Sequence, residues 1–177
     1  MFKCFYPGVR YDSVYAIDFN KYYDLGYRLL LFDIDNTLVM HDAPANDKAV
    51  QLFGELHGIG FRTFLISNNG EERVRPFAEA VGSGYVCHAG KPKMDGFNKA
   101  MKLSGASREE TMMIGDQLFT DMWGANRAGV LAVYTEKIAR DPHFYIRLKR
   151  AGESLIMLFY RLYEGKIQPV RYLREYK

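Results

Sequence analysis

Carboxylates follow two apolar runs of the chain. Asp33 and Asp35 come directly after Leu29-Leu30-Leu31-Phe32, and Asp116 follows the apolar stretch 111–114. Side chains two residues apart at a strand end project to the same side, so Asp33 and Asp35 are expected to lie close together. Three crowded carboxylates are stable when a cation joins them. An all-oxygen set of ligands suits a hard cation, most simply Mg²⁺.

Groups that bind anions follow two further apolar stretches. Ser67 follows 61–66 and supplies a hydroxyl, and the turn around Asn68 supplies backbone N–H groups that can bind an anion. Lys91, beyond the stretch 84–87, supplies a compact positive charge, and Lys93 is the alternative lysine. Because protein-bound Mg²⁺ commonly completes its coordination with phosphate oxygens, these residues together predict a site for a phosphoryl group.

The elements that must position these residues alternate along the chain. Apolar stretches predict five strands, at 28–34, 61–66, 84–87, 111–114 and 130–134. The intervening stretches predict helices at 45–57, 71–81, 93–104 and 120–128. Strands that are apolar throughout indicate an α/β fold, with a Rossmann-like, parallel five-stranded sheet and helices on both faces. Ligands bind at the carboxyl ends of such strands, where all the polar residues above are expected.

Three segments are predicted along the 177 residues. Residues 1–28 form an aromatic-rich, irregular lead-in packed on the body, 29–140 form the α/β domain, and 141–177 form a basic, aromatic, helical extension. From Lys137 onwards the chain has ten Lys or Arg and four Asp or Glu, so the remaining residues carry −3 of the net charge of +3. Such an imbalance can indicate an anionic partner for the extension.

Neither targeting nor redox signals are evident. Cys4 and Cys87 have no metal-ligand spacing. The N-terminus has no apolar h-region, and no apolar run approaches the ~20 residues of a membrane-spanning helix. A cytoplasmic setting is therefore expected.

Four motifs, each after a predicted strand, resemble those of the haloacid-dehalogenase (HAD) superfamily. They are Asp33-Ile34-Asp35-Asn36-Thr37, Ser67-Asn68-Asn69, Gly90-Lys91-Pro92 and Gly115-Asp116-Gln117-Leu118-Phe119-Thr120-Asp121. The Asp-Asn-Thr-Leu variant and the short intervals between motifs are most similar to the type IIIA, YqeG-like phosphatases, over residues 5 to 140. The resemblance implies a magnesium-dependent phosphatase that acts through an aspartyl-phosphate.

The resemblance also implies a role for each acidic residue. Asp33 is the expected nucleophile, with its other carboxylate oxygen on Mg²⁺. Asp35 is the expected general acid and then general base, and its backbone carbonyl is expected to bind the metal. Asp116 is the expected third protein ligand of Mg²⁺.

The other motif residues are expected to hold the phosphoryl group or to support the site. Ser67, Asn68 and Lys91 are expected to contact the phosphate of the substrate. Asp121 is expected to orient Lys91, although it could instead cap the helix that follows. The supporting residues are therefore Asn36, Thr37 and Asp121, of which the first two shape the loop after the nucleophile.

No cap domain is expected over the site. Only 31 residues (36–66) separate Asp35 from Ser67, and only 23 (68–90) separate Ser67 from Lys91. An open site suits a bulky substrate such as a lipid headgroup, a protein or a polymer end. YqeG-like proteins resemble a mitochondrial phosphatidylglycerophosphate phosphatase, which favours that lipid as the substrate. Nucleotides, sugar phosphates and phosphoproteins remain alternatives, as does a non-catalytic module that binds nucleic acid or a ribosome through the basic extension.

Residues 144–163 mix apolar and basic side chains. This pattern fits an interfacial helix attracted to anionic lipid. Because Gly152 interrupts it and the apolar positions form no clean stripe, it fits slightly better a helix that packs on the body and exposes its arginines. The first interpretation predicts a peripheral contact with the inner face of the membrane. Nucleic acid is not an expected partner of the enzyme, and an oligomer is left open.

Overall fold

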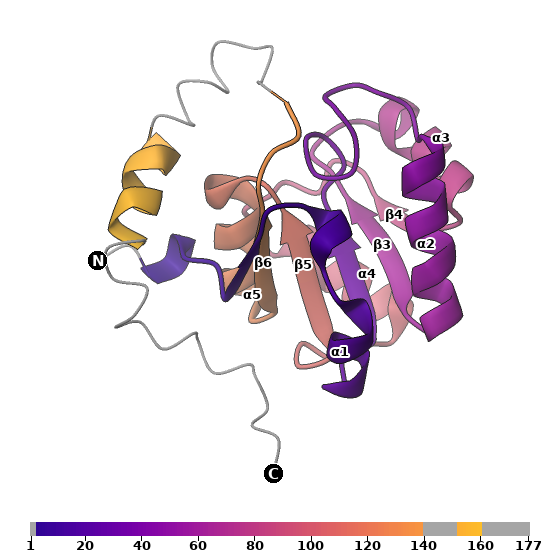
Figure 1. The fold of residues 1–177 in the computed structure, drawn as a ribbon, viewed down its shortest axis with the longest axis horizontal. Coiled ribbons are helices and arrows are strands. Elements are labelled where there is room, and N and C mark those ends of the chain that lie inside the picture. Colours follow the sequence, from indigo (N-terminus) through magenta and orange to yellow (C-terminus); the bar gives the residue numbers. More distant parts are fainter. Residues whose placement is uncertain (1–2, 140–151, 161–177) are drawn as a thin grey trace.

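The computed structural model describes residues 3–139 and 152–160. A parallel sheet forms the centre of the molecule, with helices on both faces (Figure 1). The strand order is β1-β6-β5-β2-β3-β4, and every neighbouring pair is parallel. The predicted α/β class and the parallel sheet are confirmed. The predicted number of strands was wrong, because the sheet has six strands and not five.

The strands are short and mostly buried. They are β1 (Val9–Tyr11), β2 (Leu29–Phe32), β3 (Arg62–Ile66), β4 (Gly84–Val86), β5 (Thr111–Gly115) and β6 (Leu131–Thr135). The strand β2 lies in the interior of the sheet, between β5 and β3, so the residues that follow it lie at the centre of one sheet edge.

The unpredicted strand is β1, in the lead-in that was expected to be irregular. Val9 pairs with Val133 and Tyr11 with Thr135, and Arg10 forms an ion pair with Glu136. A strand of three half-buried residues shows no measurable alternation of apolar and polar positions, so the sequence pattern gives no signal. The strand forms because the outer edge of β6 offers unpaired N–H and C=O groups.

The helices are α1 (Phe19–Asp24), α2 (Asp47–Ile59), α3 (Glu71–Val81), α4 (Asp95–Ser104) and α5 (Trp123–Ala128). Short 3-10 turns occur at η1 (Lys3–Phe5) and η2 (Val14–Ala16). The predicted helix at 120–128 consists of the end of a π-helical turn, η3 (Leu118–Met122), and of α5, which follows that turn directly. A further helix at 152–160 is called the tail helix below.

The two faces of the sheet have separate cores, as the alternation of side chains along β2 requires. Leu30 and Phe32 point into the core that α1, α2 and α3 cover. Leu29 and Leu31 point into the core that α4, α5 and the tail helix cover. Because all four side chains are fully buried, the register of β2 is fixed, and so is the position of the residues that follow it.

The tail helix packs beside the N-terminal turn η1 (Figure 1). Ile156, Met157 and Tyr160 belong to the second core, and the ring of Tyr160 lies 5.2 Å from that of Tyr6. The rest of the predicted helical region, 144–151 and 161–163, falls outside the described residues. Among the described helices, none combines the length and apolar character needed to cross a membrane.

Candidate active site

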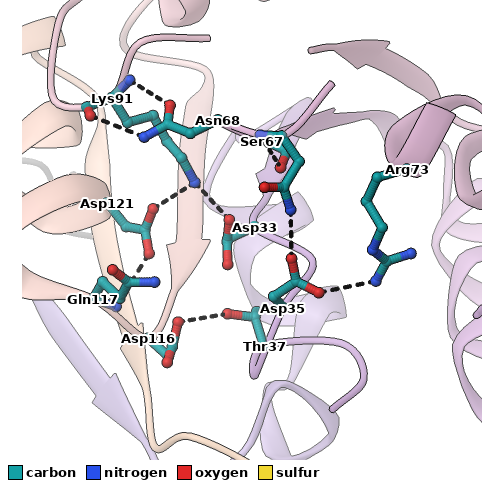
Figure 2. A network of polar contacts seen from close by, with 11 residues as sticks. Asp33, Asp35, Thr37, Ser67, Asn68, Arg73, Lys91, Asp116, Gln117 and Asp121 are labelled. Atoms are coloured by element: carbon teal, nitrogen blue, oxygen red, sulfur yellow. Dashed lines mark hydrogen bonds and ion pairs between the residues drawn. The ribbon is translucent and has the colours of Figure 1, made fainter. Parts of the chain in front are cut away.

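The site lies where β2 and β5 end. The backbone N–H of Asp33 donates to the carbonyl of Ile114 at 3.0 Å, which extends the ladder between the two strands by one residue. Asp116 follows β5 directly. The pairing of the two strands therefore places both carboxylates at one edge of the sheet (Figure 2).

A tight loop turns the chain after Asp33. Asn36 has a φ of 64°, and its N–H donates to the carbonyl of Val39 at 2.7 Å. Asparagine tolerates this left-handed conformation better than most residues. The turn aims Thr37 at the site, where its hydroxyl donates to the Asp116 carboxylate at 3.4 Å. Asn36 and Thr37 thus lie in the loop after Asp33, and their supporting role in the reaction stays a prediction.

Lys91 is buried between two carboxylates. Its ammonium Nζ donates to Asp33 Oδ1 at 2.6 Å and to Asp121 Oδ1 at 2.7 Å. The other oxygen of Asp121 accepts from the N–H of Gln117 at 3.1 Å. The structure thus brings Asp121 to the lysine, whereas the alternative lysine, Lys93, is exposed.

The Ser67 turn holds the Lys91 loop. The Asn68 side chain accepts from the Lys91 N–H at 2.7 Å and donates to the Lys91 carbonyl at 3.1 Å. The hydroxyl of Ser67 is buried and accepts from the N–H of Asn69 at 3.1 Å. The phosphate contacts of Ser67 and Asn68 stay predictions. For Asn68, whose side chain already bonds Lys91, the main chain would have to provide that contact.

Burial and neighbouring charges shift the pKa values of Asp33 and Lys91. Burial raises the pKa of Asp33 to about 7, although the Lys91 ammonium opposes this rise. Burial alone would lower the pKa of Lys91, but Asp121 and Asp33 raise it above its ordinary value. Lys91 therefore stays charged. Burial makes ionisation of Asp33 unfavourable unless a second cation binds beside its carboxylate.

The carboxylates also fit a divalent cation. One oxygen each from Asp33, Asp116 and Asp121 lie within 4.8 Å of one another. Asp33 Oδ2 is buried and has no hydrogen-bond partner among the described residues, as expected of an oxygen that binds a cation. Both oxygens of Asp121 already accept hydrogen bonds, so Asp33, through Oδ2, is a better ligand than Asp121. The Asp35 carboxylate lies outside this cluster, which leaves its predicted metal contact to the backbone carbonyl.

Two residues near Asp35 had no predicted role. Arg73 donates to Asp35 Oδ1 at 2.9 Å, and the Asn69 side chain donates to Asp35 Oδ2 at 2.8 Å. Asn69 belongs to the recognised Ser-Asn-Asn motif, but its side chain had no assigned partner. For Arg73 the sequence gives a weak signal at most, namely a cation in the first turn of the helix that follows that motif.

The fold and the site define a class of enzyme. The chain belongs to the haloacid dehalogenase-like hydrolases, because the model of that family matches residues 39–129. It is a phosphatase of the YqeG-like kind. The chain is 32% identical over 156 residues to "Probable phosphatase YqeG" of Bacillus subtilis (strain 168), covering 88% of this chain and 91% of that protein.

Two further comparisons are consistent with this family. The chain is 28% identical over 159 residues to "Phosphatidylglycerophosphate phosphatase 1, chloroplastic" of Chlamydomonas reinhardtii, covering 83% of this chain but 59% of that protein. The crystal structure of a HAD phosphatase from Thermococcus onnurineus shares the fold with a TM-score of 0.54. That match has 13% identity and covers 66% of this chain and 90% of the other.

Proposed function

We propose that this phosphatase hydrolyses phosphatidylglycerophosphate to phosphatidylglycerol, with Mg²⁺, through an aspartyl-phosphate on Asp33. The observation that carries the mechanism is the environment of the Asp33 carboxylate. One oxygen is bonded by the Lys91 ammonium at 2.6 Å, and the other is buried without a partner among the described residues. A carboxylate with this environment is arranged for a cation and a phosphoryl group and not for a structural ion pair.

The first half of the reaction transfers the phosphoryl group to the protein. An oxygen of Asp33 attacks phosphorus, so a bond from Asp33 to phosphorus forms while the bond to the leaving oxygen breaks. The leaving oxygen keeps the electron pair and receives a proton from Asp35. Lys91 and Ser67 hold the phosphoryl oxygens during this transfer.

The second half returns the protein to its starting state. Asp35, now a carboxylate, accepts a proton from water, and the oxygen of that water attacks phosphorus. The bond between Asp33 and phosphorus breaks and releases inorganic phosphate. Asp33 and Asp116 would hold Mg²⁺, which when bound supplies positive charge beside the phosphoryl oxygens.

Two features support a lipid substrate. Residues 36–66 and 68–90, where a cap would be inserted, contain only the elements of the domain itself, so they place no lid over the site. The Chlamydomonas reinhardtii relative bears the name of a phosphatidylglycerophosphate phosphatase. A site to which these two segments add no cap can admit a headgroup that stays in its bilayer.

The tail helix supports a peripheral position on the membrane. Its side chains form two apolar faces, one packed on the body and the other directed outward. The outward face consists of three exposed residues: Leu155, Leu158 and Phe159. Glu153 accepts from the N–H of Phe119 at 3.1 Å, so the described part of this helix lies next to the turn that carries Asp121. We propose that this face enters the interfacial region of an anionic membrane, with the basic residues of the extension adding electrostatic attraction.

Phosphate release with and without Mg²⁺ tests the function. Wild type and Asp33→Asn are compared on phosphatidylglycerophosphate in mixed micelles, soluble glycerophosphates, nucleotides and a phosphopeptide. Magnesium-dependent release that favours the lipid and disappears in Asp33→Asn is the expected result. Release from soluble esters alone would retain the mechanism and remove the lipid substrate, and no release from any ester would refute the proposal.

Vesicle binding tests the position on the membrane. Leu155→Glu should release the protein from vesicles that contain anionic lipid. Leu103→Glu is the matched control, since Leu103 is 61% exposed on α4 and Leu155 is 55% exposed. Equal vesicle binding by the two variants, with both folded, would contradict the proposed contact.

A further inference from the structure

Three donors hold the carboxylate of Asp35. Arg73 and the backbone N–H of Asp42 donate to Oδ1 at 2.9 and 3.0 Å, and the side chain of Asn69 donates to Oδ2 at 2.8 Å. Figure 2 shows Arg73 on the opposite side of Asp35 from Asp33. Asp35 is thus engaged with the α3 side of the site, and a donor that released it would give its carboxyl group more freedom to turn toward a leaving oxygen.

Arg73 has N–H groups that its bonds to Asp35 and Ala43 do not use. Of its five N–H groups, those on one terminal nitrogen bond both Asp35 and the carbonyl of Ala43, at 2.9 and 2.8 Å. Its Nε is buried and has no partner among the described residues. Its side chain is 18% exposed, so the guanidinium is sheltered and yet reachable. A guanidinium in this state suits an additional planar or tetrahedral anion, which it can bind through two N–H groups.

A cavity of about 690 Å³ adjoins this cluster. Arg73, Asn69 and Asp42, which all contact Asp35, are among its lining residues. Its charged residues include both signs: Asp42, Glu71 and Glu72 are acidic, and Arg73 and Arg75 are basic. Arg75 is 56% exposed and lies near Glu71 and Glu79, so Arg73 is the more sheltered guanidinium of this cavity.

We infer that this cavity binds the leaving group, and that Arg73 recognises a second anionic group on it, of the phosphodiester class. The inference rests on the proposed phosphatase reaction and assigns the specificity of the same site. When the anion binds to the N–H groups that Asp35 does not use, it draws the guanidinium of Arg73 away from Asp35, and the carboxyl group of Asp35 becomes able to turn toward the leaving oxygen. A substrate without the second anion leaves Arg73 on Asp35, so binding of the remote group improves the reaction and not only the affinity.

The test compares two soluble substrates with the same reacting group. Glycerol 3-phosphate lacks a diester, whereas glycerophosphoglycerol phosphate, the deacylated form of the proposed lipid, carries one. With Mg²⁺, wild type should show the higher kcat/KM for the diester-bearing ester. Arg73→Gln should lower the ratio of the two kcat/KM values about 10- to 100-fold, because the diester-bearing ester loses a hydrogen bond to a charged group whereas Asp35 is released for glycerol 3-phosphate as well.

Two variants make the result specific. Arg73→Lys keeps the positive charge but lacks the paired N–H groups of the guanidinium, so it should restore part of the preference for the diester-bearing ester. Lys99→Gln removes one positive charge from the exposed surface of α4 and should leave the preference unchanged. Equal losses on both substrates in Arg73→Gln, or no preference in the wild type, would overturn the inference, because Arg73 would then only position Asp35.

Binding separates this inference from the proposed function. The dissociation constant of glycerophosphoglycerol phosphate is measured by calorimetry for Asp33→Asn with and without Arg73→Gln, with folding checked by thermal unfolding. A constant raised about 10-fold by Arg73→Gln supports the inference even if wild type hydrolyses no ester, and an unchanged constant refutes it. Absence of hydrolysis in wild type would instead count against the proposed function.

Discussion

Replacing Asp33 with asparagine should stabilise the metal-free protein, and the gain should depend on pH. Burial raises the pKa of Asp33 from 3.8 to about 7. A carboxyl with a higher pKa in the folded protein holds its proton more tightly there. Stability is therefore lost as the pH rises from the unfolded value through the folded one, between about pH 4 and pH 7. An asparagine side chain cannot ionise, so Asp33→Asn should not suffer this loss.

The size of the effect follows from the shift. A difference of about 3 pKa units corresponds to about 4 kcal/mol at pH 8, which is an upper limit. The pKa of about 7 already includes the attraction of Lys91, so the loss that opposes the gain is a different one: the side-chain NH₂ of asparagine would take the place of Oδ2, which is buried without a partner among the described residues. A net gain of about 2 kcal/mol is expected, which would raise Tm by roughly 4–8 °C for a chain of this size.

Thermal unfolding of wild type and Asp33→Asn checks this reasoning. Without divalent cations, the difference in Tm should be small at pH 4.5 and largest at pH 8. At pH 8, Mg²⁺ should raise the Tm of wild type more than that of the variant, because binding to the native state stabilises it. Asp24→Asn, on an exposed position of α1, is the control for loss of an acidic group. A lower Tm for Asp33→Asn at pH 8, or a difference independent of pH, would refute the argument.

Three further outcomes can be measured. Gly115→Ala should lower the free energy of unfolding by about 1–3 kcal/mol and reduce kcat, because the added Cβ would lie 2.5 Å from Asp121 Oδ2 and displace Asp121, which contacts Lys91. The control is Gly54→Ala on α2, whose added Cβ meets nothing within 4 Å and which should raise Tm. Comparable effects of the two substitutions would contradict this reasoning. Asp116→Asn should raise the Mg²⁺ concentration needed for half-maximal phosphate release, and an unchanged titration would remove Asp116 from the metal ligands. Glu153→Ala should cost about 1–2 kcal/mol in thermal or urea unfolding, since the N–H of Phe119 loses its acceptor, and an unchanged stability would show that this bond does not hold the tail helix.

The sequence predicted the central strands and the polar residues at their ends for a physical reason. The strand β2 is buried on both faces, so its apolar run is continuous and its end is marked by Asp33. The parallel pairing of β2 with β5 is then enough to bring Asp33 and Asp116 together at the carboxyl edge of the sheet. Local pattern and long-range structure coincide here, which is why the position of the candidate site could be predicted.

Features that depend on contacts between distant segments could not be predicted. The strand β1 is too short to show a period, and it exists because β6 has an open edge. Arg73 looks like any surface cation of an amphipathic helix until the fold places it 2.9 Å from Asp35. Residues 144–163 show no single apolar stripe, which slightly favoured a helix packed on the body, but only the fold shows that the described part, 152–160, has one apolar face packed there and another directed outward.

The pairing of β1 with β6 also constrains the order in which the chain can fold during synthesis. The strand β1 is made first of the six, but its partner residue Val133 belongs to the last. Until β6 emerges, Val9–Tyr11 has no place in the sheet, and Tyr6 lacks the core that residues of β6 help to form. A nascent chain halted before β6 would expose β5 as a bare, apolar edge, the kind of edge that pairs with other chains. Completion of the last strand therefore protects the sheet as well as closing the fold.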